Sequence, residues 1–418
     1  NLTDVDRWAR VQEIPDTLLW RVRHELKQNT MDLIRDNVAR NWGKYSTPHI
    51  WREDLLARLN PSALLIGFAR RFAPYKRADL ILSDLQRLDR IVNHSSRPVQ
   101  IVFAGKAHPN DGMGKALIEK VLQVCRDERF LGKIFFLENY DVRIARHLVQ
   151  GVDVWLNNPR RPLEASGTSG EKVVINGVLN LSISDGWWVE GYDGTNGWTI
   201  GPVKKGYTEE TGDPDNEDAQ SLYSLLEDTI VPLFYERDVS GVPTKWIAKI
   251  KRSMQSLTPV FNTDRMLFDY LHEMYEPAAQ REGELTKNDY RLVKQLADWK
   301  SKIPMRFSSL RLVDVIVEGI HGDTVIVDRP VTVRVRIDPG KMTEEEIYAE
   351  MIIGLRGAGG FIGVPESVPL RKAGRSADGI ITYIAEYPVR QNGPYSYGIR
   401  VMPYYRHLAS KLETGLIL

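Results

Sequence analysis

Residues 152–183 read VDVWLNNPRRPLEASGTSGEKVVINGVLNLSI and hold two apolar runs, at 152–156 and 179–183. Short apolar runs of this kind are typical of strands that are buried on both faces. Between them, a Gly-Thr-Ser-Gly turn at 167–170 precedes a helical pattern at 171–175. This order predicts two parallel strands joined by a helix.

The same alternation extends over residues 61–205, with further apolar runs at 63–68, 99–103 and 133–137. A helix that packs on the sheet is indicated by apolar side chains at i, i+3, i+4 and i+7, namely Ile118, Val121, Leu122 and Cys125. We therefore predict an α/β fold with a doubly wound parallel sheet, covered by helices on both faces.

Three further regions flank this one. Residues 1–60 show helical spacing, residues 206–304 read mostly as helix, and residues 305–418 alternate with period 2 between Gly-Pro and Pro-Gly turns. The first region is periodic at Leu18, Leu19, Val22 and Leu26. The last region predicts a β-sandwich domain.

Composition excludes several classes of protein. The chain has 56 Lys and Arg against 55 Asp and Glu, which argues against a strongly basic nucleic-acid binder and a highly charged disordered chain. No run approaches the roughly 18 apolar residues of a membrane span. The single cysteine, Cys125, permits no disulfide within the chain and no cysteine-based metal site, so we expect no metal and a reducing compartment, the cytoplasm.

A cationic cluster follows the run at 63–68. Ligands of open parallel sheets bind beyond the carboxyl ends of the strands, and right-handed crossovers bring those ends to one edge. The cluster consists of Arg70, Arg71, Lys76 and Arg77. Guanidinium and ammonium groups bind phosphate oxygens, which predicts a phosphate site, although a solvated helix start with salt bridges explains the cluster equally well.

The turn at 167–170 admits two interpretations. Backbone N–H groups at a helix start bind anions, but ordinary Gly/Ser turns have the same composition. Lys172, just beyond the turn, can form a Schiff base with a phosphorylated aldehyde or can be a surface lysine. Glu164 can accept hydrogen bonds from a sugar hydroxyl or cap the loop. The absence of GxGxxG and Walker A patterns argues against a dinucleotide or P-loop nucleotide site.

Four stretches together resemble the α-glucan phosphorylases: 68–77 (FARRFAPYKR), 102–109 (VFAGKAHP), 136–140 (FLENY) and 153–201. The chain is most similar to the shorter bacterial and archaeal branch, over about residues 1–280 and more weakly in the tail. The resemblance implies a GT-B fold, in which two doubly wound domains enclose an active-site cleft and this chain supplies the C-terminal half.

The resemblance implies a role for each region. Residues 1–60 link to a missing N-terminal domain, 61–205 form the Rossmann-like cofactor- and phosphate-binding domain, 206–304 complete the GT-B fold, and 305–418 form the β-sandwich. The front half is then expected on another polypeptide or removed, in keeping with a chain that starts at Asn1 without a methionine. Whether the chain forms a homo-oligomer is left open.

The resemblance also implies roles for individual residues. Pyridoxal phosphate is held as a Schiff base by Lys172, with its phosphate bound by Thr168, Ser169 and Arg70 and its site lined by Tyr140. Inorganic phosphate is bound by Arg71 and Lys76, and the reacting glucose by Glu164, Ser166 and Gly167. The residues implied in catalysis are Lys172, Arg71, Lys76 and Glu164.

The implied reaction cleaves the terminal α-1,4-linked glucose of a glucan with phosphate and yields α-glucose 1-phosphate. The cofactor phosphate serves as an acid–base group, so two phosphates touch and cations must surround them. At ~4 Å and an effective dielectric of ~20, each unit-charge pair contributes roughly 4 kcal/mol. Repulsion between the phosphates raises a phosphate pKa towards neutrality, where proton transfer is efficient.

One residue departs from the family pattern, and two alternative functions remain open. Glu171 stands where the family usually has methionine, so its charge can perturb the adjacent lysine or point to solvent. A nucleotide-sugar glycosyltransferase of the GT-B type is one alternative, although such enzymes need no cofactor lysine. A non-catalytic glucan-binding half-protein is the other.

Overall fold

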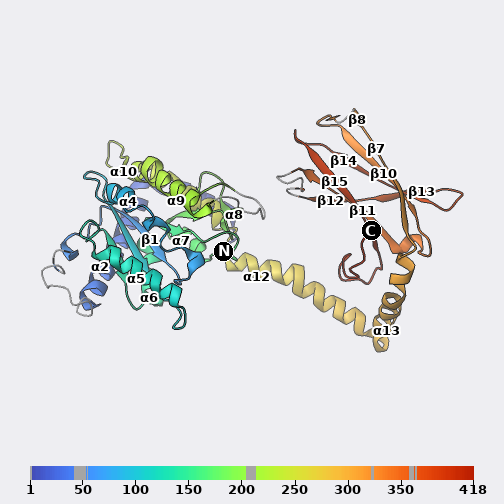
Figure 1. Ribbon diagram of the computed structural model, residues 1–418, viewed down its shortest axis with the longest axis horizontal. Coiled ribbons are helices and arrows are strands. Elements are labelled where there is room, and N and C mark those ends of the chain that lie inside the picture. Colours follow the sequence, from blue (N-terminus) through green and yellow to red (C-terminus); the bar gives the residue numbers. More distant parts are fainter. Residues whose placement is uncertain are drawn as a thin grey trace. The chain divides into compact units, whose positions relative to one another are not determined.

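The computed structural model describes the following residues: 2–41, 53, 55–203, 213–321, 324–356, 362 and 365–418. The chain divides into two compact units, residues 1–269 and 270–418 (Figure 1). The boundaries predicted at residues 60, 205 and 304 stay predictions.

The first unit contains a six-stranded parallel sheet in the order β3-β2-β1-β4-β5-β6. Its strands are β1 (Leu64–Ala69), β2 (Val99–Ala104), β3 (Ile134–Leu137), β4 (Val154–Asn157), β5 (Leu179–Ile183) and β6 (Trp198–Ile200). Every residue of β1 and β2 is buried, which explains their uninterrupted apolar sequence. The predicted α/β class with a parallel sheet is confirmed, and the strand order reverses between β1 and β4, where such sheets bind ligands.

Helices cover both faces of this sheet (Figure 1). Leu64, Ile66 and Phe68 of β1 share one core with four helices, α4 (Leu85–Val92), α5 (Gly112–Arg126), α9 (Pro214–Leu225) and α11 (Thr244–Leu257). Leu65 and Ala69 face the opposite core, with α2 (Asp16–Asn41) and α6 (Val142–Gly151). The sheet is therefore doubly wound, as predicted.

The helix predicted near the start of the chain is present as α2, whose buried residues are polar in its first half and mainly apolar further on, at Met31, Leu33 and Ile34. Leu18 and Val22 are about 40% exposed, whereas Arg23 and Lys27 are buried. Arg23 donates to the carbonyls of Gln150, Val152 and Asn176, and Lys27 donates to Ala63 O and to Asp153. Burial lowers the pKa of Lys27, and Asp153 opposes that effect. These bonds fasten α2 to the amino ends of β1 and β4.

The other helical segments of the first unit are short. They are α1 (Val5–Ala9), η1 (Arg10–Glu13), η3 (Pro74–Lys76), η4 (Leu80–Leu82), α7 (Ser169–Val174), α8 (Trp188–Gly191), η5 (Leu226–Ile230), α10 (Val231–Tyr235) and α12 (Thr263–Tyr270). Within the described ranges, none of the helices is both long enough and apolar enough to cross a membrane.

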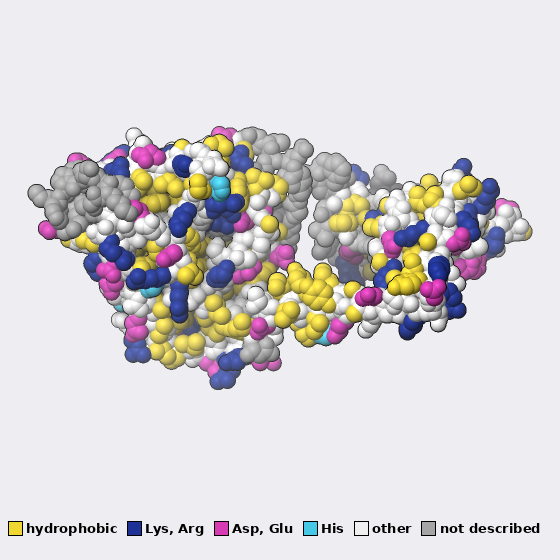
Figure 2. All heavy atoms as spheres, turned by 90° about the horizontal axis from the view of Figure 1, so that it is seen from below, with side chains coloured by type: hydrophobic (Ala, Val, Ile, Leu, Met, Phe, Trp, Pro, Cys, Tyr) yellow, Lys and Arg dark blue, Asp and Glu magenta, His cyan; other side chains and the backbone are white. Residues whose placement is uncertain are grey.

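Exposed apolar side chains gather on α12 and on the π-helical turn η6 (Leu271–Tyr275) that follows it. They are Met266, Leu267, Phe268, Tyr270, Leu271, Met274 and Tyr275, each more than 40% exposed. Figure 2 shows them as a patch of yellow atoms. This segment crosses the division between the two units, so the apolar surface belongs to the stretch that joins them.

The second unit consists of α13 (Glu276–Phe307) and two antiparallel sheets, with strand orders β13-β14-β10-β7 and β12-β11-β15. The strands are β7 (Arg311–Glu318), β10 (Pro330–Asp338), β11 (Ile347–Leu355), β12 (Glu366–Pro369), β13 (Arg371–Arg375), β14 (Ile381–Pro388) and β15 (Tyr395–Pro403), and a small β8–β9 ladder joins Ile320–His321 to Thr324–Val325. Val331, Val333 and Val335 alternate into a core shared by both sheets. The predicted β-rich tail with period 2 is therefore confirmed.

A buried carboxylate organises this unit. Glu350 in β11 is fully buried and contacts Arg400 in β15, Lys411 in the terminal segment and the Ser367 hydroxyl. Burial raises the pKa of Glu350, but the hydrogen bonds from Lys411, Ser367 and Arg400 outweigh it, so the net pKa lies below its ordinary value of 4.5. The ionised form is therefore the one that the folded state stabilises.

Replacing Glu350 with glutamine will lower the free energy of unfolding at pH 7 by about 1–3 kcal/mol, because two partly exposed cations lose a charged acceptor. A depressed folded-state pKa contributes stability above the unfolded pKa and loses it as the pH falls through the folded one. The difference between wild type and variant, measured by denaturation of the full chain, will therefore shrink between pH 6 and pH 3.

Glu318→Gln is the matched control, because Glu318 pairs with Arg334 at 3.2 Å on the exposed edge of the same unit. Surface pairs of this kind contribute little, so this variant should unfold like the wild type. Equal losses in both variants, or a Glu350→Gln loss that does not depend on pH, would contradict the role given to the buried carboxylate.

Candidate active site

Two cations and a carboxylate meet where the strand order reverses. Arg70 directly follows β1, Lys76 ends η3, and Glu164 lies in the loop after β4. Arg70 Nη2 donates to Glu164 Oε1 at 2.7 Å, and Lys76 Nζ donates to Glu164 Oε2. All three side chains are more than 90% buried. The loops predicted to converge at the carboxyl edge of the sheet therefore do so.

Backbone contacts hold these loops close together. A Cβ at Gly105, after β2, would lie 1.9 Å from Arg70 O, so only glycine permits this approach. Glu164 N donates to Asp185 Oδ2 at 3.0 Å, and burial raises the pKa of Asp185. Trp187 N donates to Ser166 O at 3.0 Å. The sequence analysis did not predict Asp185 as a site residue, although its position just after the apolar run at 179–183 places it at the same edge of the sheet.

Lys172 lies one helical turn beyond Thr168 in α7. Its Nζ donates to Thr168 Oγ1 at 3.1 Å, and its side chain is exposed. Ser169 Oγ accepts a hydrogen bond from Trp155 Nε1 at 3.3 Å. A Cβ at Gly167, whose φ is +86°, would lie 3.5 Å from Glu164 Cγ. The turn that leads to the lysine thus begins beside the buried carboxylate.

Glu171 is a partly buried neighbour of this lysine. Burial raises its pKa, while Lys172 and Arg265 of α12 oppose the rise. The carboxylate thus has two cations in electrostatic range rather than solvent alone.

Three other predicted residues lie around this core. Arg71 is exposed, and its Nη2 donates to the Tyr75 hydroxyl at 3.4 Å. Tyr140, just after β3, is partly buried, and burial raises its pKa while Arg70 lowers it, so the two side chains are within electrostatic range. Ser166 is partly buried in the loop that carries Glu164.

Arg77 requires a correction. The sequence predicted it in the same cationic cluster as Lys76, but its side chain binds Asp215 and Asp218, each at 2.8 Å. Its backbone has a φ of +49°, in the left-handed region. Residue type alone could not show this, because the carboxylates that bind Arg77 lie more than 130 residues along the chain.

The residues present fit pyridoxal phosphate. Among the described residues, Arg70 Nη1 is buried with no hydrogen-bond partner. A buried cationic donor of this kind requires an acceptor, and a phosphate oxygen supplies one. Lys172 adds an exposed amine, and Thr168 and Ser169 add hydroxyls on the same turn. The donor set thus suits a ligand that carries both a phosphate and an aldehyde.

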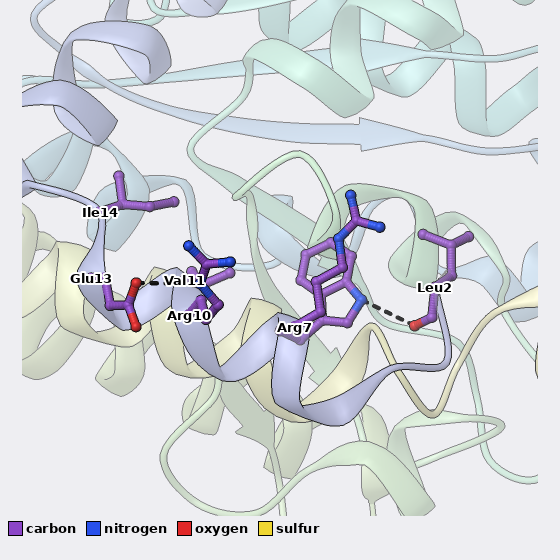
Figure 3. A pocket seen from close by; sticks show the side chains of 7 residues that line it. Leu2, Arg7, Arg10, Val11, Glu13 and Ile14 are labelled. Carbon is purple, nitrogen blue, oxygen red and sulfur yellow. Dashed lines mark hydrogen bonds and ion pairs between the residues drawn. The ribbon is translucent and has the colours of Figure 1, made fainter.

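A separate hollow of about 600 Å³ lies at the start of the chain (Figure 3). Its wall is formed by Leu2, Arg7, Trp8, Arg10, Val11, Glu13 and Ile14. Trp8 Nε1 donates to Leu2 O at 3.0 Å, and Arg10 pairs with Glu13. None of the predicted site residues lines it.

The buried contact of Arg70 and Lys76 with Glu164 lies at the switch point of a doubly wound α/β sheet, the place where proteins of this fold class bind ligands. Residues 29–195 match the family model described as carbohydrate phosphorylase, and residues 308–418 match the one described as glycogen phosphorylase C-terminal domain. The chain belongs to the carbohydrate phosphorylase family, which confirms the resemblance found in the sequence.

Individual relatives support this assignment. The chain is 40% identical over 413 residues to maltodextrin phosphorylase of Thermococcus litoralis, a match that covers 98% of this chain and 47% of that protein. It is 47% identical over 277 residues to glycogen phosphorylase of Aquifex aeolicus, covering 66% and 39%, and 35% identical over 410 residues to glycogen phosphorylase of Mycobacterium bovis, covering 98% and 47%. The chain spans about half the length of the curated relatives it matches.

Proposed function

We propose that this chain is the cofactor- and phosphate-binding half of an α-1,4-glucan phosphorylase. The observation that carries the proposal is the buried contact of Arg70 and Lys76 with Glu164 at the switch point of the sheet. The front half, on another polypeptide or in a longer chain, supplies the opposite wall of the cleft. The substrates are an α-1,4-glucan and inorganic phosphate, the product is α-glucose 1-phosphate, and the compartment is the cytoplasm.

Five residues hold pyridoxal phosphate in this proposal. Lys172 anchors its aldehyde, Thr168, Ser169 and Arg70 bind its phosphate, and Tyr140 lines its site. When bound, the cofactor supplies an acid–base phosphate next to the substrate phosphate. Arg70 suits its role because Nη1 can donate a hydrogen bond to the cofactor phosphate while Nη2 keeps its hydrogen bond to Glu164.

The remaining residues bind the substrates. Arg71 and Lys76 hold inorganic phosphate, and their charges offset its repulsion by the cofactor phosphate. Glu164 accepts hydrogen bonds from a hydroxyl of the reacting glucose while Arg70 and Lys76 fix its orientation. Ser166 and Gly167 add contacts from the same loop, where a glycine at φ +86° lets a sugar approach the backbone closely.

Replacing Arg71 with alanine will raise the KM for phosphate about tenfold to a hundredfold, because one charge-assisted contact is worth about 1.5–3 kcal/mol. The KM for the glucan should stay unchanged. Initial rates of phosphorolysis at varied phosphate measure this directly. Arg90→Ala, on the exposed side of α4, is the control. Unaltered phosphate kinetics in Arg71→Ala would remove Arg71 from the phosphate site.

The function itself is tested by formation of α-glucose 1-phosphate from a maltodextrin and inorganic phosphate. The assay uses this chain with bound cofactor, alone and together with the front half of a phosphorylase added as a separate polypeptide. We expect turnover only with both halves. Chain extension from a nucleoside diphosphate glucose, with none from glucose 1-phosphate, would overturn the proposal in favour of a nucleotide-sugar transferase.

A further inference from the structure

Arg77 bridges the two loops that carry the candidate site. It directly follows Lys76, and its side chain is 4% exposed. Its Nε donates to Asn158 O and its Nη2 to Pro159 O, both at 2.9 Å, while its own carbonyl accepts from Asn158 Nδ2 at 2.8 Å. The segment after β1 and the segment after β4 are thus joined by one buried guanidinium.

Asp218 binds both loops from a third element, α9. It is 2% exposed, and its Oδ2 accepts from Arg77 Nη2 at 2.8 Å. Its Oδ1 accepts from Arg161 Nη2 at 3.3 Å. Arg161 lies three residues before Glu164, just as Arg77 lies one residue after Lys76. A single carboxylate therefore contacts the neighbours of both members of the buried ion pair.

Apolar side chains anchor α9 to the sheet. Ala219, Leu222 and Tyr223 bury the apolar face of the helix in the core of the sheet, and the Tyr223 hydroxyl donates to Ile81 O at 2.8 Å. Asp218 is buried on the same side of α9, one turn before Leu222, and its carboxylate accepts hydrogen bonds from Arg77 and Arg161. The carboxylate therefore ties both loops to a helix that is anchored in the core.

We propose that Asp218 is a positioning residue for phosphate binding. Through Arg77 and Arg161 it fixes the loops so that Lys76 and Glu164 lie within contact of each other. The left-handed backbone at Arg77 is intrinsically unfavourable and persists only where surrounding contacts hold it. Displacing a binding group by about 1 Å can cost two orders of magnitude in rate. This inference rests on the proposed function for the identity of the anion.

The test is Asp218→Asn, which keeps the size of the side chain and removes its charge. In the phosphorylase assembled from both halves with cofactor, we expect the KM for phosphate to rise about tenfold and the KM for maltodextrin to change less than twofold. Glu227→Gln is the matched control, because Glu227 follows α9, pairs with Arg87 at 2.7 Å and contacts neither loop. A uniform loss of kcat with no change in either KM would overturn the proposal.

A second variant separates positioning from general stability. If Asp218 acts through Lys76, the double variant Asp218→Asn/Lys76→Met will have the same KM for phosphate as Lys76→Met alone. If Asp218→Asn causes an independent structural defect, the increases in KM of the two single variants will multiply in the double variant. Arg161→Gln, which leaves the Arg77–Asp218 pair intact, should show the same pattern more weakly and serves if Asp218→Asn does not fold. Multiplicative effects in both double variants would overturn the proposal.

Binding of inorganic phosphate to this chain, measured by calorimetry, distinguishes the two ideas. If the wild type binds phosphate but the enzyme assembled from both halves shows no phosphorolysis, the proposed function fails, and a tenfold weaker affinity in Asp218→Asn still supports the positioning role. Equal affinities in wild type and variant overturn the positioning role alone. Absence of both phosphate binding and turnover in the wild type overturns both.

Discussion

Replacing Lys172 with alanine will abolish retention of pyridoxal phosphate and reduce phosphorolysis at least a thousandfold, equivalent to about 4 kcal/mol of transition-state stabilisation. The amine is exposed, and Thr168 Oγ1 is its hydrogen-bond acceptor, so it can attach to an aldehyde without breaking a buried contact. The proposed ligands of the cofactor phosphate, Arg70, Thr168 and Ser169, would remain, but reversible binding alone should not survive dialysis.

The measurement is the absorption of bound cofactor after dialysis, together with the mass of the chain after borohydride reduction. Wild type should gain the mass of one reduced cofactor on the peptide that contains Lys172. Lys115→Ala, an exposed lysine of α5, is the control and should load like the wild type. Covalent loading of Lys172→Ala at wild-type levels would show that another lysine anchors the cofactor and would sink the assignment.

The sequence predicted the sheet because its strands are buried on both faces. The residues of β1 and β2 must then be almost wholly apolar, and their polar successors must lie at one edge. This reasoning placed Arg70, Lys76 and Glu164 at the same edge before any distance was known. The order of the strands was not predictable, because nothing local records that β1 lies beside β4.

The sequence could not show which charged side chains pair with each other when they lie far apart along the chain. For the cluster that contains Arg77 the sequence left open a phosphate site or salt bridges, and Arg77 forms a salt bridge with Asp218, which lies far along the chain. Arg23 and Lys27 of α2 are likewise buried against strand-end carbonyls and Asp153, which the helical spacing of that region does not indicate. The role of a cationic side chain cannot be assigned from the sequence until its acceptor is known. An apolar run, in contrast, indicates a buried strand by itself.

Replacing Lys76 with methionine will raise the KM for phosphate by about a hundredfold to a thousandfold. One unit-charge pair at ~4 Å with an effective dielectric of ~20 is worth roughly 4 kcal/mol, and each 1.4 kcal/mol is a factor of ten. Lys76 is buried, so solvent screens its charge little, and methionine keeps most of the volume of the side chain. The effect should exceed that of Arg71→Ala, because Arg71 is exposed.

A second readout reports the same change without turnover. Burial tends to raise the pKa of Tyr75, but hydrogen bonds to Lys76 and Arg71 outweigh it and leave the net pKa below the ordinary value. In Lys76→Met the pKa of Tyr75 should therefore rise, which a difference titration of phenolate absorbance against the wild type will detect. Lys120→Met is the control, because Lys120 pairs with Asp79 at the surface, at 2.8 Å.

The two readouts constrain each other. A raised phosphate KM together with a raised Tyr75 pKa locates the lost charge at the buried cluster and leaves the glucan side of the cleft intact. A shifted Tyr75 with unchanged phosphate kinetics would mean that Lys76 only orients Glu164, and phosphate would have to be bound by Arg71 and the front half. The ion pair of Lys76 with Glu164 makes the first outcome the expected one, since the ammonium that contacts this proposed glucose-binding carboxylate would also contact a phosphate bound beside it.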